Sequence, residues 1–219
     1  MTDPAPSAPP RRALVSRLVG VATLVVVAAA LVWQFAGGLG GAPTEGTDDD
    51  RVGEFAPDFT LETLGGDGET ITLEDHLGDV ILIDFWATYC PPCRRSMPHL
   101  QDLHDELDGE SFTLLSVNVD RPAPDRDELV AGYMDAQGFD FPVLMDNGRV
   151  TWLYEATRIP LAVIVGPDRR IEYVFQGATD PRIVERAVRH VLSTVDATAQ
   201  APLEAGDAVA VSAPSPTAR

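Results

Sequence analysis

The sequence contains little cysteine and no lysine. Its 219 residues include two cysteines, Cys90 and Cys93, and four histidines. A structural zinc site needs about four ligands at regular spacing, but the chain has no second cysteine pair and no histidine that we expect to face the cysteines, because His99 and His104 are expected to face solvent. These absences argue against a zinc-binding module and direct attention to the one cysteine pair.

Positive charge is also scarce. The chain has 34 acidic residues and 16 basic ones, all of them arginine, and its formal net charge is −18. Between Arg51 and Asp196 there are 27 acidic residues and 12 arginines, a net charge of −15. Such a surface repels nucleic acid and anionic lipid headgroups. We therefore expect no nucleic-acid partner and interpret most of the acidic residues as a solvated surface.

One long apolar run interrupts this polar composition. Residues 18–35 carry no charge, and as a helix they would span about 27 Å, close to the hydrocarbon thickness of a bilayer. Arg11, Arg12 and Arg17 precede the run, which predicts that the N-terminus stays cytoplasmic. We predict a single-pass transmembrane anchor at residues 13–39, with the following domain periplasmic or extracellular. A cleaved signal is the alternative, because small residues follow the run.

Composition divides the rest of the chain. Residues 1–12 are rich in Pro and Ala and are predicted to be a disordered cytoplasmic N-terminus. Residues 40–51 form a Gly-rich, acidic linker, and residues 52–195 have the length of one ordinary domain. Residues 196–219 lack aromatic side chains and contain several prolines, which predicts a disordered tail.

Hydrophobic periodicity predicts an α/β domain. Residues 80–83 are apolar at every position, as in a strand buried on both faces, and Leu129 is expected on the inward face of a later helix. The other elements expected are a hairpin over 59–73, a helix over 93–107, strands over 111–120, 141–146, 161–166 and 170–177, helical turns over 148–156, and a last helix with Asp180 as its N-cap. This order predicts a mixed sheet with helices on both faces.

The cysteine pair lies between a predicted buried strand and a predicted helix. This position places Cys90 at the helix N-terminus, where unpaired N–H groups and the positive end of the dipole favour its thiolate form. Cys93, one turn later, is positioned to resolve a mixed disulfide by attacking Cys90. A purely structural disulfide is the alternative, but closing so short a loop removes little unfolded-chain entropy. The spacing therefore favours redox chemistry.

The segment "ILIDFWATYCPPC" resembles the active-site strand and turn of thioredoxin. Together with "FAPDFTL", a segment from Asp120 to Asp146 and the predicted anchor, the chain is similar to the membrane-tethered TlpA/ResA-like thiol–disulfide oxidoreductases. The resemblance implies a thioredoxin fold with an N-terminal β-hairpin extension and a central insertion. It also implies protein disulfide substrates, a membrane or periplasmic thiol as electron donor, a possible role in cytochrome c maturation, and no bound cofactor or metal.

The resemblance assigns roles to further residues. Asp84 matches a buried acid that would take the proton from Cys93, and Pro160 matches a cis-proline that presents Ile159 to an extended substrate. We expect Trp86 and Tyr89 to contact substrate as well.

Three prolines are predicted to have structural roles. Pro98 is expected to bend the helix that follows the cysteines. Pro91 and Pro92 each remove an N–H that would stabilise the Cys90 thiolate, which predicts a low potential and hence a reductase. Ser96 stands where TlpA/ResA-like reductases usually carry Glu, which is consistent with an acid that lies on the strand instead of the helix.

Two other functions fit parts of the pattern. A peroxiredoxin-like peroxidase would also begin with "APDFTL", although Ala87 stands where such enzymes need Thr. A copper-delivery protein of the same fold would use Cys90, Cys93 and a distant histidine. Such sites want a longer cysteine spacing and a histidine in the late loop, whereas none lies between His104 and His190.

Overall fold

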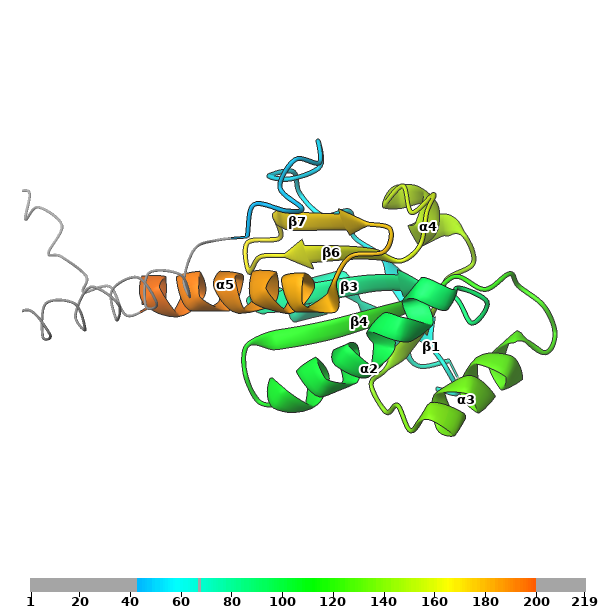
Figure 1. Cartoon of the computed structure of the whole chain (residues 1–219). Helices are drawn as coiled ribbons and strands as arrows, with labels where there is room; N and C mark the ends of the chain where they lie inside the picture. The colour runs from blue at the N-terminus through cyan, green and yellow to red at the C-terminus, as the bar shows by residue number, and fades with distance from the viewer. Residues whose placement is uncertain (1–42, 67, 200–219) are drawn as a thin grey trace, which may run out of the picture. The chain divides into compact units, whose positions relative to one another are not determined.

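The computed structural model describes residues 43–66 and 68–199 of the chain (Figure 1). The predicted N-terminal segment 1–12 and anchor 13–39 lie outside these residues, as does most of the predicted tail. Among the residues that are described, no helix combines the length and the apolar character needed to cross a bilayer.

In the described ranges, seven strands form one mixed sheet in the order β2-β1-β5-β4-β3-β6-β7 (Figure 1). The strands are β1 (Thr60–Thr63), β2 (Thr70–Thr72), β3 (Val80–Trp86), β4 (Phe112–Asn118), β5 (Val143–Met145), β6 (Leu161–Val165) and β7 (Ile171–Gln176). Strands β3, β4 and β5 run parallel, whereas β6 is antiparallel to β3 and β7 to β6. The predicted N-terminal hairpin is confirmed, because β1 and β2 pair antiparallel.

The central strand β3 is buried along its whole length, as its apolar sequence predicts. Side chains alternate between the two faces of a strand. Accordingly, Leu82 and Trp86 pack in a hydrophobic cluster on one face of the sheet, and Ile81 and Phe85 pack in a second cluster on the other. The helices therefore have to cover both faces, and this requirement sets the layers of the domain.

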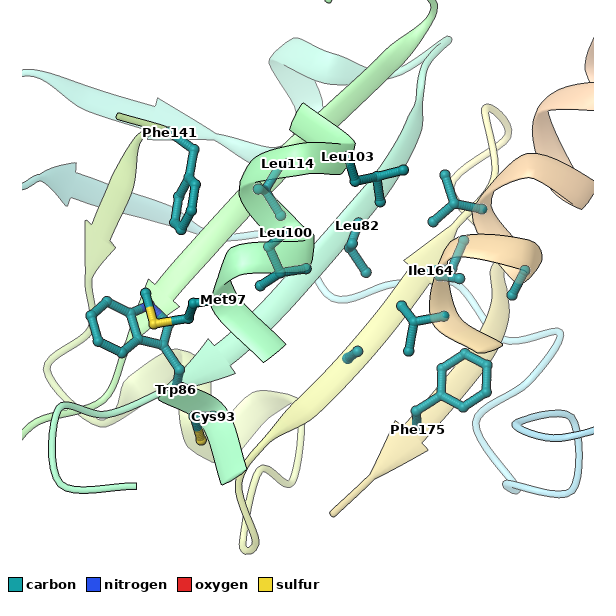
Figure 2. Close-up of a cluster of buried hydrophobic side chains, with 14 of the residues drawn as sticks. Leu82, Trp86, Cys93, Met97, Leu100, Leu103, Leu114, Phe141, Ile164 and Phe175 are labelled. Atoms are coloured by element: carbon teal, nitrogen blue, oxygen red, sulfur yellow. The ribbon is translucent and has the colours of Figure 1, made fainter. Parts of the chain in front are cut away.

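The long helices cover one face of the sheet. They are α2 (Pro91–Glu106), α3 (Arg126–Gln137) and α5 (Pro181–Ala199), and their buried residues join the cluster that contains Leu82. Figure 2 shows this cluster with Met97, Leu100 and Leu103 of α2. The shorter η1 (Leu73–His76) and α4 (Arg149–Leu153) contribute to the other cluster.

Two predictions about helix residues have different outcomes. Asp180 accepts a hydrogen bond from the Arg182 N–H at 3.0 Å, which is the interaction expected of the predicted N-cap of α5. The inward orientation predicted for Leu129 is wrong, because its side chain is 54% exposed. In α3 it is Val130 and Met134 that are buried.

The chain preceding β1 lies along the outer strand β7. The Val174 N–H donates to the Gly46 carbonyl at 2.8 Å, and the Gly53 N–H donates to the Ile171 carbonyl at 2.8 Å. Gly46 has a φ of +85°, and a Cβ at this position would lie 2.5 Å from the Phe175 ring. This close approach requires glycine.

Candidate active site

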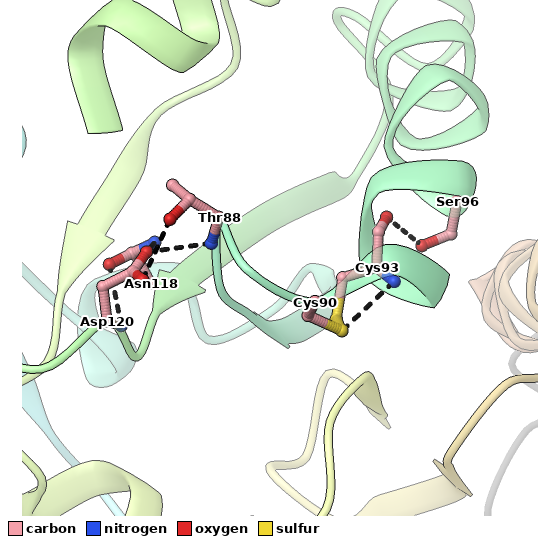
Figure 3. Close-up of a disulfide and its surroundings, with 6 residues drawn as sticks. All are labelled: Thr88, Cys90, Cys93, Ser96, Asn118 and Asp120. Atoms are coloured by element: carbon pink, nitrogen blue, oxygen red, sulfur yellow. Dashed lines mark hydrogen bonds between the residues drawn. A yellow bond between two sulfur atoms is a disulfide. The ribbon is translucent and has the colours of Figure 1, made fainter. Parts of the chain in front are cut away.

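Cys90 and Cys93 form a disulfide at the start of α2, with an S–S distance of 2.02 Å and a Cα–Cα distance of 5.3 Å (Figure 3). Cys90 is the N-cap of the helix, and its sulfur accepts a hydrogen bond from the Cys93 N–H at 3.3 Å. Cys90 is 5% exposed, whereas Cys93 has no exposed surface. This is the arrangement expected of an attacking cysteine followed by a resolving one.

Proline shapes both the start and the interior of α2. Pro91 and Pro92 occupy its first two positions, where the absent N–H groups cost no intrahelical bond. An N-cap side chain usually accepts from the second or third helical N–H. Because Pro92 has none, the Cys93 N–H is the donor to the Cys90 sulfur. Pro98 lies inside the helix, and the bend expected there stays a prediction.

Asp84 is 3% exposed in the middle of β3, which confirms the expectation of a buried acid. Burial raises the pKa of its carboxyl group from 3.8 to about 7, because desolvation disfavours the charged form. Leu82, two positions earlier, packs in the same cluster as Cys93, so strand alternation turns Asp84 toward the same helical layer. Asp84 and Ser96 border a cavity of about 30 Å³, which can hold about one or two water molecules.

Ser96 occupies the position on α2 at which the resemblance to TlpA/ResA-like reductases would predict Glu. Its hydroxyl donates to the Cys93 carbonyl at 2.8 Å, and a serine cannot serve as a carboxylate at this site. Asp84, which lines the same cavity as Ser96, is the buried acid that the resemblance to thioredoxin implied.

The turn that carries Cys90 is held by a carboxylate from the end of β4 (Figure 3). Asp120 accepts hydrogen bonds from the Thr88 N–H at 2.9 Å and from the Thr88 hydroxyl at 3.0 Å. Asn118 donates to the same carboxylate at 2.8 Å. The sequence analysis did not identify this role for Asp120. A signal existed, since Asn118 and Asp120 are polar residues at the end of an apolar strand parallel to β3.

A buried arginine connects the end of β4 to the residue that follows β5. Arg126 is 7% exposed and donates to the Asn118 carbonyl and to the Asp146 carbonyl, each at 2.7 Å. The Asp146 side chain in turn accepts from the Val150 and Thr151 N–H groups at 3.0 and 2.8 Å. The inserted segment between β4 and β6 is thereby tied to the active-site turn.

The two aromatic residues expected to contact substrate differ in exposure. Trp86 is fully buried; its indole donates to the Ser116 hydroxyl at 2.8 Å, and its ring lies 5.6 Å from the ring of Tyr133 in α3. The expected substrate contact of Trp86 is therefore corrected: this residue belongs to the core under the inserted helix. Tyr89, by contrast, is 65% exposed beside Cys90.

A groove adjoins the exposed side of the disulfide turn. The Ile159–Pro160 bond is cis, as predicted. Ile159 and Tyr89 both line a pocket of about 300 Å³, together with Arg121 and Asn147. Two of the predicted site residues, Tyr89 and Ile159, thus line the same pocket, and Tyr89 directly precedes Cys90 in the chain. Pro160 instead borders the cavity that Asp84 lines.

A mixed sheet of this topology, with a cysteine pair at the N-terminus of the helix after its central strand, defines a thioredoxin-fold thiol–disulfide oxidoreductase. Such a pair can pass two electrons by exchanging its disulfide with that of a partner.

Comparison with known proteins agrees with this class. The model of the AhpC/TSA family matches residues 52–174. Thiol-disulfide oxidoreductase ResA of Halalkalibacterium halodurans is 33% identical over 136 residues, which cover 62% of this chain and 74% of the relative. ResA of Oceanobacillus iheyensis is 36% identical over 132 residues, covering 58% and 66%.

A solved structure supports the fold independently. A thiol:disulfide interchange protein of the thioredoxin family from Chlorobium tepidum superposes with a TM-score of 0.56 at 24% identity, covering 66% of this chain and 99% of that protein. The chain belongs to the AhpC/TSA family, and it is a ResA-like thiol–disulfide oxidoreductase of the thioredoxin superfamily.

Proposed function

We propose that the protein reduces disulfides in partner proteins, with Cys90 as the attacking residue and Cys93 as the resolving one. The observation that carries this proposal is the disulfide itself, which has one partly exposed member at the helix N-cap and one buried member a turn later. In the dithiol form, the Cys90 thiolate attacks one sulfur of the partner and releases the other as a thiolate. Cys93 then attacks the Cys90 sulfur and releases the second partner thiolate. Two electrons pass to the partner, and the protein becomes the disulfide described above.

Asp84 is the proposed acceptor for the proton that leaves the Cys93 thiol. Its pKa of about 7 suits a group that must take up and release a proton near neutral pH. The cavity that Asp84 borders with Ser96 has room for a water molecule to carry this proton. The proton then leaves by the same cavity, whose lining also includes the exposed His99.

The reducing direction follows from the donors around the Cys90 sulfur. Only the Cys93 N–H donates to this sulfur among the first helical residues, because Pro91 and Pro92 have no N–H. Fewer donors stabilise a thiolate less, which lowers the stability of the dithiol form and lowers the potential. Among proteins of this fold, the reduction potential is about −120 mV for strong oxidants and about −270 mV for thioredoxin. The loss of donors therefore favours a potential closer to that of thioredoxin.

The proposed location is the outer side of the cell membrane. The apolar, uncharged residues 18–35 and the arginines that precede them support a single-pass anchor within residues 13–39, with a cytoplasmic N-terminus. Residues 1–12 are proposed to remain on the cytoplasmic side of the membrane. A thiol donor in the membrane or periplasm would restore the dithiol, and apocytochrome c would be one of the disulfide substrates.

Trapping of the mixed disulfide tests the proposal. With Cys93→Ser, partner proteins should stay covalently attached to Cys90 until a thiol reductant releases them, because no resolving thiol is present. Cys90→Ser is the matched control and should capture none. Equal capture by both variants would contradict the assigned order of attack. Consumption of hydrogen peroxide by the unaltered dithiol, with no exchange on protein disulfides, would indicate a peroxidase instead.

A further inference from the structure

The groove beside the active-site turn offers hydrogen-bond donors that are not used within the protein. It lies between the active-site turn and the segments that follow β4 and β5, and Tyr89, Arg121, Asn147 and Ile159 are among its lining residues. The groove has a volume of about 300 Å³, which is large enough to receive side chains of an extended polypeptide. What such a groove selects depends on which polar atoms remain unbonded.

The two carboxylates of the lining are already bonded within the protein. Asp120 accepts from the Thr88 N–H, the Thr88 hydroxyl and the Asn118 amide. Asp146 accepts from two backbone N–H groups and from the Thr151 hydroxyl. Their negative charges are partly balanced by the buried Arg126, which interacts electrostatically with both carboxylates. A ligand therefore meets carboxylates whose hydrogen-bonding capacity is largely used.

Two unbonded side-chain groups of the lining are donors. Arg121 is exposed, and among the described residues its guanidinium group makes no hydrogen bond or ion pair. The Asn147 side-chain oxygen accepts from the Arg149 N–H at 3.2 Å, which leaves the amide N–H₂ group of Asn147 for a ligand. Guanidinium and amide donors together match a carboxylate, whose oxygens only accept.

Several arginines of the domain are already paired, whereas Arg121 has no carboxylate partner among the described residues. Arg51, Arg169 and Arg189 each form an ion pair with a nearby carboxylate. In a domain with a net charge of −15 between residues 51 and 196, an arginine beside the reactive disulfide without such a partner is an available cation. Its charge can act on a molecule docked in the groove.

We propose that this groove binds the residue next to the cysteine of a disulfide substrate, and that Arg121 favours Asp or Glu at that position. The proposal rests on the disulfide-reducing function proposed above and specifies the class of its substrate: a polypeptide with a carboxylate beside its cysteine. Asn147 supplies a second donor to the same carboxylate.

Symmetric peptide disulfides test this selectivity. An eight-residue peptide with one cysteine is made with Glu, Gln or Lys on both sides of that cysteine, and each is oxidised to its disulfide-linked homodimer. The full-length protein is reduced and freed of reductant, and the rate of its reaction with each homodimer is measured at low salt. One protein dithiol then yields one protein disulfide and two peptide thiols, so no further reductant is needed.

The unaltered protein should reduce the Glu homodimer roughly three- to tenfold faster than the Gln homodimer, as expected for one charge-assisted contact. High salt should diminish this preference. Arg121→Gln and Arg121→Ala should remove it. Arg186→Gln, which changes the net charge equally at an exposed site on α5, should retain it.

Three results of the same assay would overturn the proposal. The acidic domain as a whole repels the Glu homodimer and attracts the Lys homodimer, so a rate that is highest for Lys would overturn the proposal. Equal rates for Glu and Gln, or a preference that survives Arg121→Gln, would also overturn it. In these cases, reduction of the Gln homodimer would leave the disulfide-reducing function intact, whereas failure to reduce all three would contradict that function itself.

Discussion

The burial of Asp84 predicts how the free energy of unfolding depends on pH. Its carboxyl group is 3% exposed, and burial raises its pKa from 3.8 to about 7. Asn has nearly the same shape as a protonated Asp but does not ionise. Asp84→Asn should therefore leave the packing of β3 intact while it removes the effect of pH on this site.

The sign of the effect follows from where the proton is bound. Between pH 4 and pH 7 the unfolded chain has lost the Asp84 proton and the folded protein still holds it, so stability falls as pH rises. A shift of about three pKa units corresponds to about 4 kcal/mol at about 1.4 kcal/mol per unit. Above pH 7 both states are ionised and the loss is complete. The Asn variant should gain about 4 kcal/mol relative to the unaltered protein between pH 4 and pH 8.

Urea unfolding of the disulfide form measures this gain. The free energy of unfolding is determined for both proteins at pH 4.5, 6, 7 and 8.5, and the difference should grow up to about pH 7 and then stay constant. Asp102→Asn, at an exposed position of α2, is the matched control and should show no comparable trend. A difference between the Asp84 variant and the unaltered protein that is the same at every pH would refute the argument that burial holds Asp84 protonated.

Two further predictions concern the active-site turn. Asp120→Asn cannot accept all three hydrogen bonds that the carboxylate receives from Thr88 and Asn118. It should lower the free energy of unfolding by about 1–3 kcal/mol and slow disulfide exchange. Thr88→Val, which keeps the N–H donor, should have a smaller effect in the same unfolding and exchange assays. Pro92→Ala restores an N–H near the Cys90 sulfur, so the dithiol form should become more stable and the potential should rise by about 30 mV or more. Equilibration with a glutathione buffer measures this potential, and an unchanged or lower value would contradict the proposed role of the prolines.

Local sequence signals predicted most of the fold. The apolar run of β3 is buried on both faces, and the hairpin before it and the helix after Cys90 are present. Asp84 could be predicted as a buried acid because the segment around it resembles the active-site strand of thioredoxin. In each case the information lies within a few residues of the feature.

The errors and omissions have tertiary causes. Trp86 is covered by Tyr133 of the inserted helix α3, and no local pattern around Trp86 indicates that contact. Leu129 fits an inward position by spacing, yet the helix turns Val130 and Met134 toward the core instead. Such outcomes depend on how distant segments pack, which periodicity does not specify.

The hydrogen bonds of Arg126 bear on the absence of lysine from the chain. Its guanidinium group reaches two main-chain carbonyls at once, those of Asn118 and Asp146, from two of its nitrogens. An ammonium group is a single point at the end of a flexible stem and does not present two parallel donors of fixed separation. Whatever set the arginine-only composition elsewhere, at this position a lysine would not make both of these side-chain contacts in the same geometry.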